Sequence, residues 1–195
     1  MFYDEFSVSE QNSCYYGWAK RNTRPQVKSN EASRKRLNGM LAIDVASGEE
    51  YLWLSSHAQS DDVARYMAHL TLQMDELGVE RLEIVLDQNT THKQRMQQLY
   101  QEELNQLSLQ QQRLIKTELV FTYLPAYSPK LNVVEYAIHL LRQRCLHHRP
   151  YNMKMEQIEQ LLTKELLKKQ LLSTQQISNI LLYIQDLVNC PKLTV

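Results

Sequence analysis

Short apolar runs separated by polar segments predict five β-strands in this chain. The runs cover residues 2–7, 37–45, 51–55, 82–86 and 119–124. The run at 82–86 is almost continuously apolar, which is typical of a strand buried on both faces of a sheet. Residues 46–49 predict a hairpin turn between the second and third strands, because Gly48 adopts backbone angles that other residues avoid.

Apolar positions spaced three and four residues apart predict five helices. The helices cover residues 60–77, 91–107, 132–148, 153–171 and 173–188. Ser60 is the expected N-cap of the first helix, and Gly78 is its stop signal. Ser173 and Gln176 form a capping box at the start of the last helix.

The order of these elements predicts the fold class. Three strands come first, helices and strands then alternate, and a helical tail follows. A hairpin-linked trio of strands followed by alternating helices and strands predicts an α/β fold, with a mixed five-stranded sheet and flanking helices. We expect residues 1–150 to form this domain and residues 151–195 to form a C-terminal helical extension.

The charge of the chain is balanced overall but not locally. The 195 residues include 22 Lys and Arg and 22 Asp and Glu, so the formal net charge is zero. This balance excludes a strongly basic protein that coats DNA. The polar loop at 20–36 is basic, however, and both a solvated loop and a contact with the DNA backbone are compatible with it. The candidates for DNA contact in this loop are Arg21, Arg24, Lys28, Arg34, Lys35 and Arg36.

Other features concern the compartment. Polar residues interrupt every apolar run before the ~18 residues of a membrane-spanning helix, and the acidic start MFYDEF is unlike a signal peptide. We therefore expect a cytoplasmic protein with no membrane partner. Cys14, Cys145 and Cys190 are far apart and odd in number, which fits free thiols better than disulfides or a zinc site.

Three acidic residues occupy special places in the predicted elements. Asp4 lies in the first strand, Asp87 ends the fourth strand, and Glu135 lies in the first turn of the third helix. If the first and fourth strands are neighbours, the two aspartates lie side by side and Glu135 can close the site from above. Three converging carboxylates need a cation, and hard oxygen ligands favour Mg²⁺ or Mn²⁺. Two such ions about 4 Å apart would hold the attacking and leaving oxygens of a phosphodiester.

Each acid also has a purely structural interpretation. Asp4 could be a solvated residue at a frayed terminus, and Asp87 could close an Asx turn. Glu135 follows Asn132 by three residues, so its charge could simply complement the N-terminal end of a capped helix. The ordered set of three acids, rather than any one of them, favours a metal site.

The helix of Glu135 carries further polar residues on one line. His139 and Arg142 follow Glu135 at i+4 and i+7, beside the apolar stripe of the helix. Both side chains could contact the phosphates of a DNA strand near the metal site, and both could instead belong to a solvated face.

Two stretches of the sequence resemble a known family. IVLDQNTTHK at 84–93 and LPAYSPKLNVVE at 124–135 are the specific ones, and DEF at 4–6 and GW at 17–18 precede them in the same order. In these motifs the chain resembles the DDE transposases, in particular the bacterial insertion-sequence relatives of the mariner transposases. Val133 and Gln88 stand where that family usually has Pro and Asn.

The resemblance implies a fold, a reaction and a set of residues. It implies an RNase H-like catalytic domain that cuts transposon ends with water and joins the freed 3′ hydroxyl to target DNA, with divalent metal. The metal-binding triad would be Asp4, Asp87 and Glu135, and Asn89 and His92 would support it. A homodimer that pairs two DNA ends is expected, with the apolar tail as a candidate contact. When acting, the protein would be at the bacterial nucleoid.

The start of the chain differs from the family pattern. The family carries helix-turn-helix DNA-binding segments before the first Asp, whereas three residues precede Asp4 here. We expect a clipped first strand and a DNA-binding segment supplied separately. The alternative is a truncated or domesticated remnant that lacks catalysis and binds DNA or protein.

Overall fold

The computed structural model describes residues 1–11, 18–24, 35–150, 152–168 and 170–189. Its strands are β1 (Phe2–Ser9), β2 (Arg36–Ile43), β3 (Glu50–Ser55), β4 (Arg81–Leu86) and β5 (Glu118–Tyr123). Its longer helices are α1 (Ser60–Glu76), α2 (Gln94–Gln110), α3 (Val133–Leu141), α4 (Met155–Lys168) and α5 (Thr174–Asn189). Cys14, Cys190 and the Gly17 of the GW motif lie outside the described residues.

The strands form one mixed sheet in the order β3-β2-β1-β4-β5. The pairs β1–β2 and β2–β3 are antiparallel, and the pairs β1–β4 and β4–β5 are parallel. The predicted mixed five-stranded sheet is therefore confirmed, and the condition that the first and fourth strands are neighbours is met. β1 runs through the middle of the sheet.

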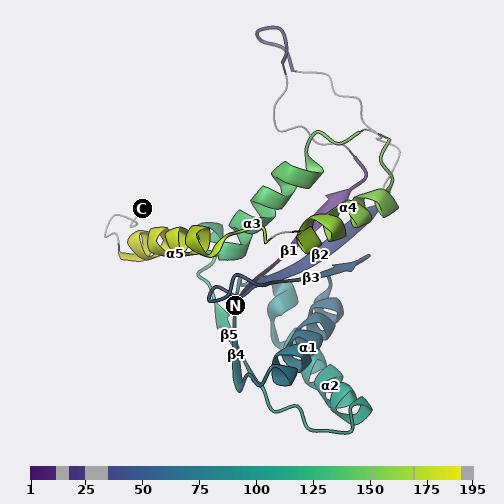
Figure 1. Cartoon of the computed structure of the whole chain (residues 1–195), viewed down its shortest axis with the longest axis vertical. Coiled ribbons are helices and arrows are strands. Elements are labelled where there is room, and N and C mark those ends of the chain that lie inside the picture. The colour runs from purple at the N-terminus through teal and green to yellow at the C-terminus, as the bar shows by residue number, and fades with distance from the viewer. Residues whose placement is uncertain (12–17, 25–34, 151, 169, 190–195) are drawn as a thin grey trace.

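Helices cover both faces of the sheet (Figure 1). On one face, α1 and α2 pack on a cluster that includes Tyr3, Met67 and Ile84. On the other face, α3 and α4 pack on a cluster that includes Phe6 and Ile138. Side chains alternate between the two faces along a strand, so neighbouring residues of β1 point toward different helical layers.

Phe6 reaches its cluster by lying over a glycine. Phe6 and Gly39 are direct partners in the β1–β2 ladder. A Cβ atom on Gly39 would lie 2.3 Å from the Phe6 ring, well inside van der Waals contact. The absence of a side chain at Gly39 therefore allows the ring to lie flat on the sheet.

The helix ends differ in detail from the sequence-based expectation. The N-cap of α1 is Gln59 rather than Ser60, and the Asp62 carboxylate accepts a 3.0 Å hydrogen bond from the Gln59 amide. This reciprocal contact needs an acceptor side chain three residues after the N-cap. Asp62 lies three residues after Gln59, whereas the residue three after Ser60 is the apolar Val63. The capping box of the last helix is confirmed, since the Gln176 amide donates to Ser173 Oγ at 3.2 Å and Gln176 Oε1 accepts from the Ser173 amide at 2.9 Å.

Two predicted helices are interrupted. The helix expected at 91–107 is a short 3₁₀ turn, Thr90–His92, followed by α2 after an extended Lys93. In the region expected to be one helix at 132–148, α3 ends at Leu141 and a single π turn, Arg142–Leu146, follows it. Cys145 is buried there, as its place on the apolar face predicted.

The C-terminal helices share the core of the sheet domain. Ile158 and Leu162 of α4 and Ile177 of α5 are buried in the same cluster as Phe6 and α3. The backbone amide of Met155, at the start of α4, donates a 2.9 Å hydrogen bond to Glu10, which follows β1. The buried Arg149 before α4 donates from its guanidinium to the carbonyls of Leu146, Ser9 and Gln11. In the part of the chain that is described, no helix has the length and apolar character needed to cross a membrane.

Candidate functional site

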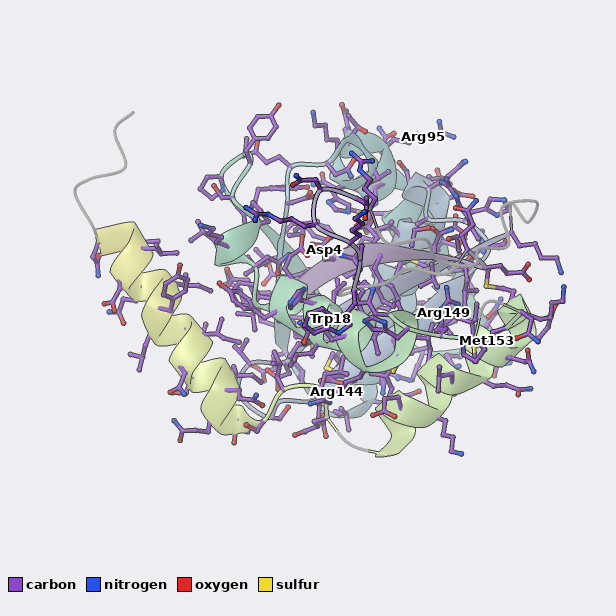
Figure 2. All side chains as sticks on the ribbon, turned by 90° about the horizontal axis from the view of Figure 1, so that it is seen from above. Asp4, Trp18, Arg95, Arg144, Arg149 and Met153 are labelled. Atoms are coloured by element: carbon purple, nitrogen blue, oxygen red, sulfur yellow. The ribbon has the colours of Figure 1, made fainter. Side chains whose placement is uncertain are left out.

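Asp4, Asp87 and Glu135 line one hollow of about 360 Å³ at an edge of the sheet. The remaining walls come from the loop after β4 and from the loop at 124–129 between β5 and α3. Figure 2 shows Asp4 on β1 in the middle of the molecule, with α4 and α5 on opposite sides. The structure therefore brings the three predicted acids together from three separate elements.

The sheet register explains why the two aspartates meet. Phe2 of β1 is level with Val85 of β4 in the parallel ladder. Two residues further along both strands, Asp4 is level with Asp87, and side chains two residues apart point to the same face. Asp4 lies inside an eight-residue strand and pairs with Leu41 of β2, so it is not a solvated residue at a frayed terminus.

Asp4 carries the clearest electrostatic signature. Burial and the neighbouring charge of Glu135 raise the pKa of Asp4 to about 7, with smaller contributions from Glu5 and Asp87. A carboxyl group with such a pKa is short of positive charge. Within the described part of the chain, no Lys, Arg or His lines the hollow.

Asn132 connects the helix to the first strand. Its Oδ1 accepts from the Val134 amide at 3.2 Å, which is the N-cap contact predicted from the sequence. Its buried Nδ2 also donates to the Tyr3 carbonyl at 3.0 Å and to Asp4 Oδ2 at 3.2 Å. The cap of α3 thus fixes where Glu135, three residues later, stands relative to Asp4.

Asp87 closes an Asx turn and also lines the hollow. Its Oδ1 accepts from the Asn89 amide at 3.0 Å, the local bond of such a turn. Asn89 lies in the wall of the same hollow. The structural and the functional interpretations of Asp87 are therefore compatible.

His92 joins the two strands behind the hollow. Its Nδ1 lies 2.8 Å from Asp87 Oδ1, and its Nε2 lies 2.8 Å from Glu5 Oε1. The His92 side chain is only 1% exposed, whereas that of Asp87 is 49% exposed. Burial alone would lower the pKa of His92, but the hydrogen bond and charge of Glu5, together with Asp87, raise it. Each ring nitrogen faces a carboxylate oxygen, an arrangement that favours the doubly protonated imidazolium form of the ring.

Glu5 is the member of this arrangement that the sequence interpretation missed. Glu5 neighbours Asp4 in the strand, so its side chain points to the opposite face of the sheet, where His92 lies. The alternation of the strand was the available signal. The 3₁₀ turn at Thr90–His92 folds the chain back so that His92 contacts Asp87 five residues earlier, and helical periodicity does not predict this turn.

The predicted basic contacts lie elsewhere. Arg21 and Arg24 are exposed, Lys35 lies 3.5 Å from Glu156, and Arg36 is exposed at the start of β2. None of these four lines the hollow. Lys28 and Arg34 lie outside the described residues. On α3, His139 is exposed on the same side as Glu135, while Arg142 is half-buried at the end of the helix.

The donor set of the hollow fits a hard divalent cation. It consists of carboxylate oxygens with a side-chain amide nearby, and a bound cation would offset the burial and the charge of Glu135 that raise the pKa of Asp4. Among the described residues, no three His, Cys, Asp or Glu side chains are already gathered closely enough to hold an ion. The carboxylates share the hollow without converging on one point.

A mixed five-stranded sheet in this order, with helices on both faces, is an RNase H-like fold. A sequence profile of one family with the description DDE superfamily endonuclease matches residues 1–160. The chain belongs to this endonuclease family. No curated protein sequence is a significant match.

Solved structures of a transposase have the same fold. The chain superimposes on the Mos1 mariner paired-end complex with Mn at a TM-score of 0.61, with 15% identity over 96% of this chain and 54% of the other. The paired-end complex with Mg gives a TM-score of 0.61, with 18% identity over 96% and 53% of the two chains. A pre-cleavage Mos1 transpososome gives 0.64, with 12% identity over 96% and 54%. The chain spans about half the length of the Mos1 chains that it matches.

Proposed function

We propose that this chain is the catalytic domain of a DNA transposase, in which Asp4, Asp87 and Glu135 are the catalytic carboxylates. The observation that carries the proposal is the hollow that these three acids share, in which the pKa of Asp4 is raised to about 7. Membership of an endonuclease family supports it. The Mos1 structures support it too, since they are complexes with Mn, with Mg and with a transposon end.

The three carboxylates would hold Mg²⁺ or Mn²⁺, with two ions as the proposed number. These ions would supply Lewis-acid activation of a phosphodiester and of the attacking water or 3′ hydroxyl. The protein orients the ligands. Asp87 Oδ1 is engaged by His92 and by the Asn89 amide, which leaves Oδ2 for a cation. Asp4 is held between its own strand and Asn132.

The same electrostatics makes binding of DNA and of metal interdependent. A hollow lined by three acids and no cationic side chain repels phosphate until a cation is present. The partners proposed are therefore transposon ends and target DNA, approached by a homodimer. The basic residues of the 20–36 loop would contact the DNA backbone, and a helix-turn-helix segment would recognise the ends.

The test is metal-dependent nicking of supercoiled plasmid DNA. The wild-type chain is expected to nick in Mn²⁺ and not in EDTA. Asp87→Asn and Glu135→Gln should each lower the rate on the order of 100-fold or more, because charge stabilisation in the transition state is lost. Asp186→Asn, a change in an exposed acid of α5, is the matched control and should nick normally. Equal nicking by all four proteins would refute the proposal, and a folded wild type that never nicks would favour a non-catalytic remnant.

A further inference from the structure

A second hollow, of about 660 Å³, adjoins the first. It is lined by Pro129, Lys130, Glu135, Tyr136, His139 and Tyr183. Pro129 and Glu135 belong to the walls of both hollows. The two hollows therefore meet at Pro129 and Glu135.

Two of the six residues that line the second hollow are tyrosines. Tyr136 comes from α3 and donates a 3.1 Å hydrogen bond to the Lys130 carbonyl, which fixes its ring. Tyr183 comes from α5 and is 46% exposed, so its ring is accessible to a ligand in the hollow. Tyr136 and Tyr183 line the same hollow from two different helices, and burial, with a further contribution from the Tyr183 phenol, raises the pKa of Tyr136.

The polar groups of this hollow also fit a nucleotide. Lys130 is exposed on its wall and can pair with a phosphate. The side chain of Gln143 lies 2.9 Å from His139 Nε2 and can donate to it, so the His139 ring is held at this wall. Glu135 is the one acid among the six lining residues. Aromatic faces beside a single cation are the combination that binds single-stranded nucleic acid without regard to its sequence.

We propose that this hollow binds an unpaired nucleobase of the DNA strand that is cut beside Glu135, by stacking on Tyr183 and Tyr136. This inference rests on the proposed function, because it takes the first hollow to be the place of phosphodiester cleavage. Bound there, the base would keep its strand apart from the complementary strand while the carboxylates act. Lys130 would pair with the phosphate of the same nucleotide.

The experiment compares two DNA probes by fluorescence anisotropy with the full chain in Ca²⁺. One probe is a blunt duplex, and the other is the same duplex with a single-stranded thymidine overhang. The wild type is expected to bind the overhang probe more tightly. Tyr183→Ala should remove about tenfold of that affinity, the magnitude of losing one base–aromatic stack, and leave the blunt duplex unaffected. Tyr183→Phe keeps the ring and should bind like the wild type.

Leu182→Ala is the matched control, since Leu182 is the neighbouring residue on α5, is 57% exposed and does not line the hollow. The proposal is overturned if the wild type does not prefer the overhang, or if Tyr183→Ala binds both probes normally. It is also overturned if the substitution changes only the sedimentation of the protein, which would make the hollow a contact between two copies. Plasmid nicking separates this outcome from failure of the proposed function. If nicking depends on Glu135 but Tyr183→Ala does not change binding of the overhang probe, only the nucleobase site is refuted.

Discussion

Glu5 and His92 stand behind Asp87 and orient it without lining the hollow themselves. Each ring nitrogen of His92 is 2.8 Å from a carboxylate oxygen, one from Glu5 and one from Asp87. Partners of this kind fix the orientation of a metal-binding carboxylate and are worth about 10- to 100-fold in metal affinity. We therefore expect Glu5→Ala to weaken Mn²⁺ binding about tenfold, measured by calorimetry.

Two further variants make that measurement specific. Glu5→Gln retains an acceptor for His92 and should lose less affinity than Glu5→Ala. Ser7→Ala changes an exposed residue on the same face of β1 and should bind Mn²⁺ like the wild type. Unchanged Mn²⁺ affinity in Glu5→Ala would show that His92 does not orient Asp87.

The pKa of Asp4 leads to a prediction for the metal-free protein. The ordinary value is 3.8 and the folded value is about 7, so between them the native state binds a proton that the unfolded chain releases. The free energy of unfolding contributed by Asp4 therefore falls as pH rises through this range. Asp4→Asn should raise stability in EDTA at about pH 8 and have little effect at about pH 4, as measured by urea denaturation. Asp186→Asn should show no such pH-dependent gain, and a loss of stability in Asp4→Asn at high pH would contradict the prediction.

The site could be predicted residue by residue only in part. Asp4, Asp87 and Glu135 could be found because each stands at a place in the element order that a sheet edge brings together. Glu5 could not be assigned in the same way, because its partner His92 lies on an interrupted helix. Helical periodicity in 91–107 hides that interruption, since it describes which face is apolar and not where the backbone hydrogen bonds stop.

At the scale of elements, the β1–β2 pair depends on one close approach. The Phe6 ring occupies the space that a Cβ atom on Gly39 would need. Gly39→Ala should destabilise the protein by about 1–3 kcal/mol through overpacking, as measured by thermal or urea denaturation. The double variant Gly39→Ala with Phe6→Leu should recover part of the loss from steric strain. An unchanged stability in Gly39→Ala alone would show that the ring moves aside freely.

The elements themselves were predicted more accurately than their ends. All five strands and all five helical regions exist, because their apolar periodicities reflect burial against the sheet. The N-cap is Gln59 and not the predicted Ser60, because Asp62 accepts a hydrogen bond from the Gln59 backbone amide. Apolar periodicity gives no information about such a side-chain contact. The pairing of β1 with β4 could be stated only as a condition, because the sequence indicates it only if Asp4 and Asp87 belong to one site.

At the scale of the whole molecule, the two C-terminal helices complete the core of the sheet domain. Ile158, Leu162 and Ile177 fill the cluster above β1 and α3. A chain that ends at residue 150 would expose this cluster, at about 1.5–3 kcal/mol for each large apolar side chain left uncovered. We expect it to unfold without cooperativity or to aggregate, as seen by calorimetry and near-ultraviolet circular dichroism. A chain ending at residue 189 is the control and should unfold like the wild type. Cooperative unfolding of 1–150 at the wild-type temperature would show that residues 151–195 are an independent appendage.

The central place of β1 also has a consequence for the order of events during synthesis. β1 leaves the ribosome before the other strands, yet its parallel neighbour β4 ends at Leu86 and the last acid follows at residue 135. Contacts so distant in sequence form late and slowly. A nascent chain therefore holds no assembled carboxylate site until Glu135 has been translated, and a product that terminates before this residue would lack the third acid of the hollow.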